Sequence, residues 1–178
     1  MQVIRGPLDG LLVIEPRVHR DVRGCFLEAW HRERYAEIGL PAAFVQDNVS
    51  TSRRAVLRGL HYQVGRPQGK LVSVVQGEIF DVAVDIRPGS PSFGRWFGVC
   101  LSSETGRQLY VPEGFAHGFL VLSETAVVYY KCTAAYMPEG DRSIRWNDAA
   151  IGVEWPLPDP ILSDKDRTAP LLCEAEIG

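Results

Sequence analysis

The stretch LVSVVQGEIFDVAVDI, residues 71–86, consists largely of Val, Ile and other residues that favour extended backbone. Gln76-Gly77 interrupts it, and a glycine inside a strand-like run marks a turn or a bend. The stretch therefore predicts two strands joined at Gln76-Gly77. The residues RPGSP follow at 87–91, and their prolines and glycine predict a turn that ends the second strand.

Similar short apolar runs recur along the rest of the chain. They predict strands at 11–14, 95–101, 108–111, 118–122 and 126–133, and a strand-like context at 44–50. A polar turn that ends in glycine is expected at 19–24, leading into 25–30, and a helix is expected at 32–38. Many short strands almost without helices predict an antiparallel sandwich or barrel, and a closed barrel can hold one small ligand.

Length and charge narrow the class of protein. The 178 residues, 46% hydrophobic and 23% charged, predict one well-buried core, so a single domain is expected over residues 1–178. Its tail is expected to be irregular from about residue 156, where prolines are frequent. A formal net charge of -3 argues against binding of nucleic acid or of an anionic membrane by bulk charge. Any phosphate site must therefore be local.

Cysteine usage and hydropathy indicate the compartment. The four cysteines are scattered without a CxxC pair, which fits neither a zinc knuckle nor a disulfide-rich secreted scaffold. We therefore expect reduced thiols in a cytoplasmic protein. No charged and then apolar leader opens the sequence, and no apolar run approaches about 18 residues, so neither a signal peptide nor a membrane span is expected.

The run RGLHYQ at 58–63 places His61 between an arginine and, after a short turn, a lysine. Two interpretations of His61 stay open from these residues alone. A histidine titrates near neutral pH and can serve as a catalytic base, but a lone histidine is more often a core residue with both ring nitrogens hydrogen-bonded. His117, Tyr130 and Asp166 are possible companions, and their presence favours the catalytic interpretation.

Other polar residues also allow two interpretations. Asp47 and Asn48 stand inside the strand-like run at 44–50, where they either have buried hydrogen-bond partners or line a polar pocket. Taken alone, several further candidates have plain interpretations as strand, turn or surface residues: Tyr130, Lys70, Asp166, Arg23 and Glu28.

The run PEGFAH at 112–117 resembles the second sequence motif of the cupin superfamily, in which this turn delivers a histidine into a β-barrel. The first motif of metal-dependent cupins adds two histidines separated by one residue, and HYQ at 61–63 lacks the second. The chain has four histidines, at 19, 31, 61 and 117, and the first two lie outside both motifs. A His-rich metal site is poorly supplied, so we expect a cupin scaffold without a metal.

Over longer blocks the chain is similar to the dTDP-4-dehydrorhamnose 3,5-epimerase family. The blocks that carry this resemblance are 44–48, 56–63, 69–72, 78–87, 111–121, 130–131 and 144–148. They follow the family order from about residue 3 to about residue 166, and together they are far more specific than any single short motif. The resemblance implies an all-β, cupin-type jelly-roll barrel of antiparallel strands with a few short helices.

The same resemblance implies an isomerase of dTDP-L-rhamnose biosynthesis. Its substrate would be a dTDP-linked 4-keto-6-deoxyhexose, dTDP-4-dehydro-6-deoxy-D-glucose, whose C3 and C5 are inverted without a metal or redox cofactor to give dTDP-4-dehydro-L-rhamnose. Both carbons lie next to the C4 carbonyl, so inversion needs a base, a group that stabilises the enolate and an acid on the opposite face. By matching position, His61 would be the base, oriented by Asp166. Tyr130 would be the acid, and Lys70, with His117 nearby, would face the C4 oxygen.

Binding residues and a partner carry over in the same way. The residues that would contact the sugar nucleotide are Arg23, Glu28, Gln46, Asp47, Asn48, Arg58, His117, Tyr136, Asp141 and Lys165. Tyr136 would pack against the nucleotide, and the three cations Arg23, Arg58 and Lys165 would suit the diphosphate. Members of the family are homodimers, so Arg23 and Glu28 would act across the interface from an exchanged N-terminal segment.

Departures from the family pattern leave alternatives open. The loop 64–68 is shorter than in many members and lacks their aromatic residue, Ala135 stands where a second tyrosine is frequent, and Cys25 replaces a usual aromatic residue. An epimerase acting at C3 only or at C5 only, on a related dTDP-4-keto-6-deoxy sugar of secondary metabolism, stays open, as does the nucleobase preference. Further alternatives are a metal-dependent cupin oxygenase or isomerase, a 3,4-ketoisomerase and a non-catalytic sugar-nucleotide binding module.

Overall fold

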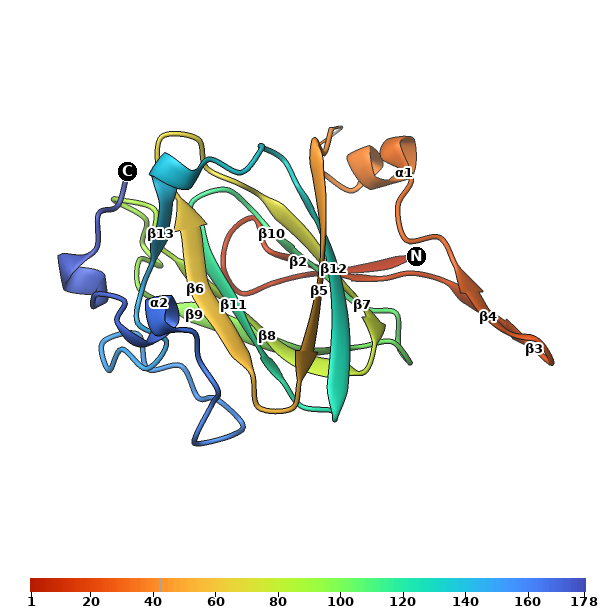
Figure 1. Ribbon diagram of the computed structural model, residues 1–178. Helices are drawn as coiled ribbons and strands as arrows, with labels where there is room; N and C mark the ends of the chain where they lie inside the picture. The colour runs from red at the N-terminus through yellow and green to blue at the C-terminus, as the bar shows by residue number, and fades with distance from the viewer. Residues whose placement is uncertain (42) are drawn as a thin grey trace.

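Two antiparallel sheets packed face to face form the body of the protein (Figure 1). The computed structural model describes residues 1–41 and 43–178. One sheet has the strand order β1 (Gln2–Arg5), β2 (Leu12–Glu15), β10 (Gln108–Val111), β7 (Lys70–Gln76), β12 (Thr125–Cys132) and β5 (Gln46–Arg53). The other has the order β13 (Asp141–Ser143), β6 (Leu57–Gln63), β11 (Phe115–Val121), β8 (Glu78–Asp85) and β9 (Trp96–Ser102). The ladders between these strands are antiparallel, which confirms the predicted all-β, cupin-type barrel.

The two strands predicted at 71–86 are β7 and β8, and they belong to different sheets. Strand β7 pairs with β10 and β12, whereas β8 pairs with β9 and β11. Gly77 joins them with a φ of +79°, and a Cβ at this position would lie 2.2 Å from the carbonyl oxygen of Thr125. Only glycine fits there, because the backbone angle and the close approach both exclude a side chain. The predicted turn is therefore the point where the chain crosses between sheets.

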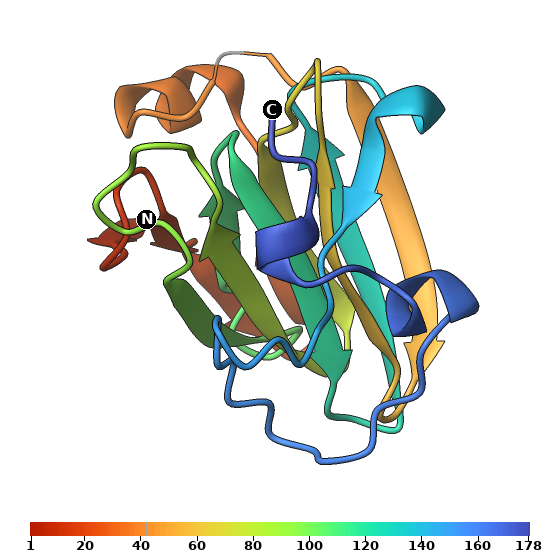
Figure 2. The same ribbon diagram turned by 90° about the vertical axis from the view of Figure 1, so that its left-hand side faces the viewer.

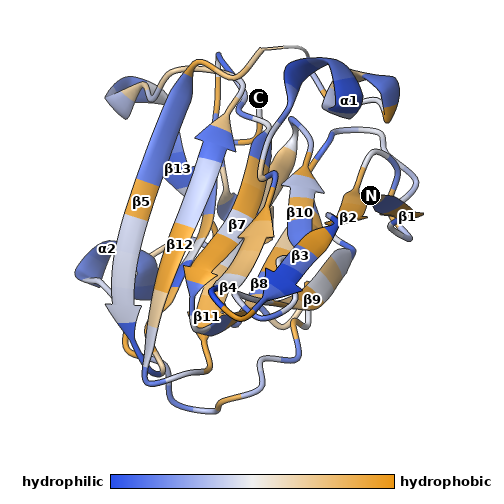
Figure 3. Ribbon diagram, turned by 90° about the vertical axis from the view of Figure 1, so that its right-hand side faces the viewer, coloured by the Kyte–Doolittle hydropathy of each residue, from blue (hydrophilic) through white to orange (hydrophobic). Residues whose placement is uncertain are grey.

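The core lies between the two sheets. Alternate residues of each strand face it, so Val72 and Val74 of β7 pack with Ile79 and Ala83 of β8 and with Phe119 of β11. Figure 3 shows apolar residues, in orange, along β7 and β8 in the middle of the barrel. Polar residues at the same alternate positions of these strands therefore also face the barrel interior.

The outer faces of both sheets are covered by non-strand segments. Helix α1 (Arg32–Glu37), which confirms the helix expected at 32–38, packs its buried Tyr35 with Leu12 and Leu71 of the six-stranded sheet. The C-terminal tail, with α2 (Asp164–Arg167) and η2 (Leu172–Glu174), runs over the five-stranded sheet (Figure 2). A further short helix, η1 (Pro138–Gly140), precedes β13. No helix among the described residues, up to 41 and from 43 onward, is long and apolar enough to cross a membrane.

The N-terminal region corrects one expectation. The predicted turn at 19–24 is wrong, because β3 (Val18–Asp21) and β4 (Gly24–Leu27) pair as a hairpin and only Val22 and Arg23 lie between them. This hairpin projects away from the barrel (Figure 1). Strand β11 also begins at Phe115 rather than at 118, which places His117 inside a strand.

Candidate active site

His61 lies on β6 and faces the barrel interior. Its neighbours Leu60 and Tyr62 belong to the apolar cluster under the C-terminal tail, so strand alternation turns His61 to the opposite face. The ring Nε2 of His61 donates to Asp166 Oδ1 over 2.5 Å. Asp166 is held in α2, where its backbone N–H donates to Ser163 Oγ over 3.1 Å. The tail thus supplies the carboxylate, and Nδ1 is the ring nitrogen left to take a proton.

The protonation of Asp166 follows from its surroundings. Burial opposes ionisation, but hydrogen bonds from His61, from Ser163 and from the backbone of Gly59 outweigh it, so the pKa of Asp166 lies below its usual value. The carboxylate is therefore ionised at neutral pH. An ionised acceptor at Nε2 fixes the ring tautomer and stabilises the imidazolium that forms when Nδ1 takes a proton.

Lys70 and Tyr130 lie on the neighbouring strands β7 and β12, where Cys132 stands directly opposite Lys70. Lys70 is only 9% exposed, and no hydrogen bond to its amine is found within the described chain. Burial lowers the pKa of Lys70, and the nearby groups Cys132, Asp81 and Asp141 oppose that shift. Burial also raises the pKa of the Tyr130 phenol, which therefore keeps its proton at neutral pH and can donate it.

These side chains share one pocket of about 280 Å³. Its lining residues come from β5, β6, β7, β12, β13, the loops at its mouth and α2: Gln46, Asn48, His61, Tyr62, Gln63, Gln68, Lys70, Tyr130, Cys132, Tyr136, Asp141 and Lys165. The structure therefore brings together most of the residues that the sequence singled out, with Asp166 directly behind His61.

Strand β5 contributes alternate residues to this pocket. Gln46 and Asn48 point inward, and Gln46 Nε2 donates to Asn48 Oδ1 over 3.0 Å. Asp47, between them, points to the outer face and accepts from Lys131 Nζ over 2.7 Å. The period of two along a strand separates these side chains. Asp47 consequently does not join the pocket of its own chain through its side chain.

An exposed aromatic ring and an ion pair form the mouth of the pocket. The Tyr136 hydroxyl donates to Asp141 Oδ2 over 3.2 Å, and Lys165 forms an ion pair with the same carboxylate. The backbone N–H of Tyr136 donates to Gln46 Oε1 over 2.7 Å. A planar ring beside an ammonium group offers a stacking surface and a cation, which are the two features that a nucleotide needs.

Two glutamines that sequence reasoning did not single out hold this mouth in place. Gln63 Oε1 accepts from the backbone of Met137 over 2.8 Å, and Gln63 Nε2 donates to the Ala135 carbonyl over 3.2 Å. Gln68 Nε2 donates to the Ala134 carbonyl over 2.8 Å. The segment that carries Tyr136 is therefore tied to both ends of the β6–β7 loop. The sequence did contain a signal for Gln63, because it is an amide inside a mostly apolar strand and a buried amide needs hydrogen-bond partners.

Three further predicted binding residues do not line the pocket. Arg23 is at the exposed tip of the β3–β4 hairpin and pairs with Asp21, while Glu28 accepts from Arg34 over 2.7 Å. Neither reaches the pocket of its own chain. Arg58 is exposed on β6 and donates to Ser52 Oγ over 3.0 Å. The roles of these residues in binding stay predictions.

His117 is buried behind the pocket rather than lining it. Its Nε2 donates to Asp81 Oδ1 over 2.8 Å, and in the β6–β11 ladder His117 stands directly opposite His61. The histidine of the second cupin motif thus has a carboxylate at the nitrogen that could ligate a metal. Among the residues described, no group of three or more His, Cys, Asp or Glu side chains is placed to hold a metal ion.

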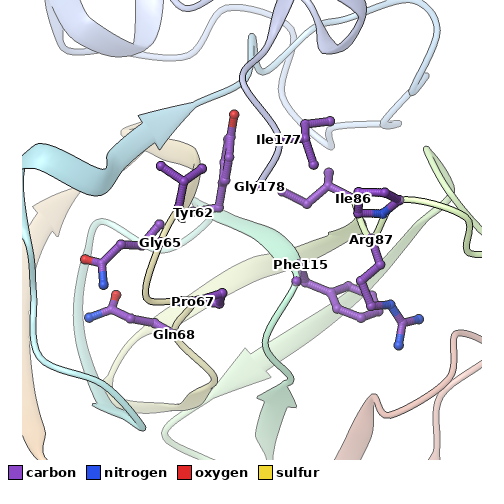
Figure 4. A pocket seen from close by; sticks show the side chains of 13 residues that line it. Tyr62, Gly65, Pro67, Gln68, Ile86, Arg87, Phe115, Ile177 and Gly178 are labelled. Carbon is purple, nitrogen blue, oxygen red and sulfur yellow. The ribbon is translucent and has the colours of Figure 1, made fainter.

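A larger cavity, of about 390 Å³, lies near the end of β6 and is lined in part by Tyr62, Phe115 and Ile177 (Figure 4). Its cation, Arg87, stacks over Phe115 with 4.7 Å from its central carbon to the ring centre and is paired with Asp85 over 2.7 Å. No histidine or carboxylate side chain stands among the described residues that line it. The smaller pocket therefore holds the groups that can move protons.

An all-β barrel with an imidazole–carboxylate pair, a buried lysine and a protonated tyrosine at one pocket is a cupin-type scaffold arranged for proton transfer. The family model described as dTDP-4-dehydrorhamnose 3,5-epimerase matches residues 5–174, and the chain belongs to this family.

Individual relatives agree with this assignment. The dTDP-4-dehydrorhamnose 3,5-epimerase of Methanothermobacter thermautotrophicus is 54% identical over 167 residues, covering 92% of this chain and 90% of the relative. The enzyme of the same name from Salmonella typhimurium is 54% identical over 178 residues, covering 98% of this chain and 97% of the relative. A crystal structure of the 3,5-epimerase from Legionella pneumophila, in complex with dTDP-4-keto-L-rhamnose, superposes with a TM-score of 0.94 at 52% identity and covers 97% of this chain and 93% of that one. The family resemblance seen in the sequence is confirmed.

Proposed function

We propose that this protein inverts C3 and C5 of dTDP-4-dehydro-6-deoxy-D-glucose and so forms dTDP-4-dehydro-L-rhamnose in dTDP-L-rhamnose biosynthesis. The observation that carries the proposal is the single pocket lined by His61, Lys70 and Tyr130, with Asp166 bonded behind His61. Family membership supports it, since the relatives carry the name of this reaction and the Legionella enzyme is bound to a dTDP-4-keto sugar.

The proposed reaction begins with proton abstraction from a carbon next to the C4 carbonyl. His61 Nδ1 takes the proton, and the electron pair of the broken C–H bond moves into the carbonyl to form an enolate. Asp166 stabilises the resulting imidazolium through Nε2. Because C3 and C5 are both adjacent to C4, one base serves both centres if the sugar is held with each C–H bond in turn toward His61.

Two further groups complete the proposed inversion. The Lys70 ammonium faces the C4 oxygen and stabilises the negative charge that develops there. Tyr130 then donates its phenolic proton to the opposite face of the carbon, which inverts the centre. The tyrosinate and the imidazolium return to their starting states by proton exchange with solvent, so the cycle consumes no other reagent.

We assign nucleotide binding to the mouth of the pocket. Tyr136 offers its exposed ring to the nucleobase, and Lys165 offers its ammonium to the diphosphate. Gln46 and Asn48 offer amide groups to the ligand in the same pocket as His61. Asp141 positions both mouth residues, because it accepts from the Tyr136 hydroxyl and pairs with Lys165.

We further propose a homodimer in which the β3–β4 hairpin reaches the partner's pocket. The hairpin projects from its own barrel (Figure 1). The apolar side chains of Val22 and Phe26 on it are exposed. Val49 and Val75 are likewise exposed on the outer face of the six-stranded sheet. Apolar patches of this kind favour burial against a second copy. Arg23 would then be supplied in trans.

Mixed dimers test this arrangement. Heterodimers of an Arg23→Ala chain and a His61→Asn chain should regain about half of the wild-type activity, because one of the two sites then has both groups. If Arg23 acts within its own chain, neither site is complete and no activity returns. Mass determination by light scattering would report the dimer independently.

No redox cofactor enters this proposal, because proton transfer next to a carbonyl changes no oxidation state. No metal ion enters it either, because the Lys70 ammonium is assigned the stabilisation of the enolate oxygen. A cytoplasmic location also belongs to the proposal. The four cysteines, Cys25, Cys100, Cys132 and Cys173, are free thiols in the described structure, which suits a reducing compartment.

Proton NMR of dTDP-4-dehydro-6-deoxy-D-glucose incubated with the enzyme in D₂O tests the function directly. Deuterium at both C3 and C5, with signals of the inverted product, is the expected result. Deuterium at one carbon would mean a single-centre epimerase. Binding of the sugar nucleotide without any exchange would mean a binding module, and the catalytic assignment would have to be abandoned.

A further inference from the structure

Asp81 is a buried carboxyl group in the floor of the barrel whose hydrogen bonding is incomplete within the described chain. It lies on β8 and is fully buried. Oδ1 accepts from His117 Nε2 over 2.8 Å, but Oδ2 is buried without a hydrogen-bond partner among the described residues. A buried carboxylate is costly unless it is paired and hydrogen-bonded, so a half-satisfied one in a well-packed core calls for a role.

The strand pattern turns Asp81 toward the same interior as Lys70. Asp81 shares a face of β8 with Ile79 and Ala83, which belong to the core cluster between the sheets. Lys70 shares a face of β7 with Val72, which belongs to the same cluster. The carboxylate and the ammonium group therefore enter one interior from opposite sheets, and no hydrogen bond neutralises Lys70 within the described chain.

Several titratable groups surround Lys70 and act on its pKa. The acidic groups Cys132, Asp81 and Asp141 favour its protonated form, against burial and against the charge of Lys165. His61 and Tyr130 line the same pocket, and His117 stands opposite His61 in the β6–β11 ladder. Of the acidic groups, Cys132 is a thiol whose pKa is raised by burial, and Asp141 is already paired with Lys165. Asp81 is thus the carboxylate left to balance Lys70.

We propose that Asp81 is a positioning residue of the epimerase reaction, which fixes the His117 ring through Nε2 and supplies the negative charge that balances the Lys70 ammonium. This inference rests on the proposed function, and it adds a residue to that site which does not touch the substrate. In this arrangement Lys70 stays protonated in the dry interior, ready for the C4 oxygen. His117 keeps its N–H on Asp81 and presents its other ring edge toward the pocket.

Asp81→Asn is the decisive variant, because the amide keeps the size and an oxygen acceptor for His117 but removes the charge. Losing one of the groups that raise the pKa of Lys70 should lower that pKa further, so the active ammonium form disappears at a lower pH. We expect the basic limb of the kcat profile to move to lower pH. At about pH 9 kcat should fall on the order of tenfold, with a change of less than about threefold near pH 6.5 and a KM within about twofold.

Asp85→Asn is a matched control. Asp85 is a buried carboxylate on the same strand, but its donors are Arg87, Ser90 and Ser92 in the turn after β8, away from Lys70. This variant should lose thermal stability and keep the wild-type pH profile. A merely structural Asp81 would behave in the same way, with a loss that is uniform across pH.

The outcomes separate this inference from the proposed function. If the wild-type enzyme exchanges no deuterium, the function fails; if it does and folded Asp81→Asn keeps the wild-type basic limb, the role of Asp81 is overturned. Should Asp81→Asn not fold, nitrogen-15 NMR of the wild-type histidines decides. The proposal requires a proton on His117 Nε2 in the active enzyme, and a bare Nε2 overturns it.

Discussion

In the part of the chain that the structure describes, the barrel contains two imidazole–carboxylate pairs with the same bonding and different surroundings. The His61 side chain is 33% exposed and opens onto the pocket, whereas His117 is only 7% exposed. Asp166 comes from the C-terminal tail, accepts from His61 Nε2, and is held by its backbone N–H, which donates to Ser163 Oγ. Asp81 comes from a central strand, and within residues 1–41 and 43–178 it has one donor, at Oδ1, and an Oδ2 without a partner.

The difference shows that position, rather than residue type, assigns the role. An imidazole that meets the pocket can exchange its proton with a ligand and with solvent, whereas a buried one can only hold a fixed orientation and a fixed charge pattern. The carboxylates follow the same logic. Asp166 is satisfied by its donors and serves one histidine, while the unsatisfied oxygen of Asp81 leaves charge to act on its surroundings.

Replacing each histidine in turn should show the largest difference between the two pairs. His61→Asn removes the base, and we expect deuterium uptake at both carbons to stop, with turnover reduced on the order of a thousandfold. His117→Asn should slow turnover and leave exchange detectable by NMR. His31→Asn, at the half-buried N-cap of α1, is the control and should behave as wild type, because asparagine can also cap a helix. Equal losses at His61 and His117 would remove the distinction between the pairs.

Replacing Lys70 tests the buried cation that lines the same pocket as His61. Lys70→Met should lower kcat by about a hundredfold or more with a small change in affinity, because the ammonium acts on charge that develops only in the transition state. Lys165→Met, at the pocket mouth, should instead raise KM. Steady-state kinetics on both variants separate the effects, and unchanged turnover in Lys70→Met would exclude it from the mechanism.

Replacing Tyr130 sharpens the assignment of His61 as base. Tyr130→Phe should still allow proton abstraction, so substrate takes up deuterium, while formation of inverted product falls by about a hundredfold. Tyr129→Phe is the control, because that hydroxyl donates to Asp47 on the outer face of the sheet. Inversion by Tyr130→Phe at the wild-type rate would overturn its role as acid.

The smallest expected effect concerns stability and pH. Because the pKa of Asp166 is lowered in the folded state, its contribution is present above the unfolded pKa of about 3.9 and is lost as pH falls through the folded value. Asp166→Asn should therefore lower the free energy of unfolding by about 1–3 kcal/mol at pH 7. Urea titrations should find the two proteins converging in strong acid. A constant difference at all pH values would contradict this origin.

Much of the fold follows from local pattern. Runs of β-branched residues predicted β7, β8 and β12, and the turn chemistry of Gln76-Gly77 predicted the break between the first two. The polar stretch at 19–24 was wrongly predicted to be a turn. It forms exposed hairpin strands, which contain few apolar residues, so the hydropathy pattern does not reveal that they pair. The alternation of side chains along β5 would have predicted that Asp47 faces away from Gln46 and Asn48. The family motif contains all three residues as one block, so the resemblance assigned them to the same pocket.

The sequence by itself determined the family and the all-β class, because strand propensity and family motifs depend on residues that are neighbours in the sequence. It also supplied the side chains that we propose to react. Only the tertiary structure decided which carboxylate serves which histidine. Asp166 meets His61 across 105 residues because the tail packs on the outer sheet, and Asp81 meets His117 because β8 pairs with β11. Burial and pairing are properties of the assembled barrel, so the charges that tune Lys70 exist only once both sheets have closed around them.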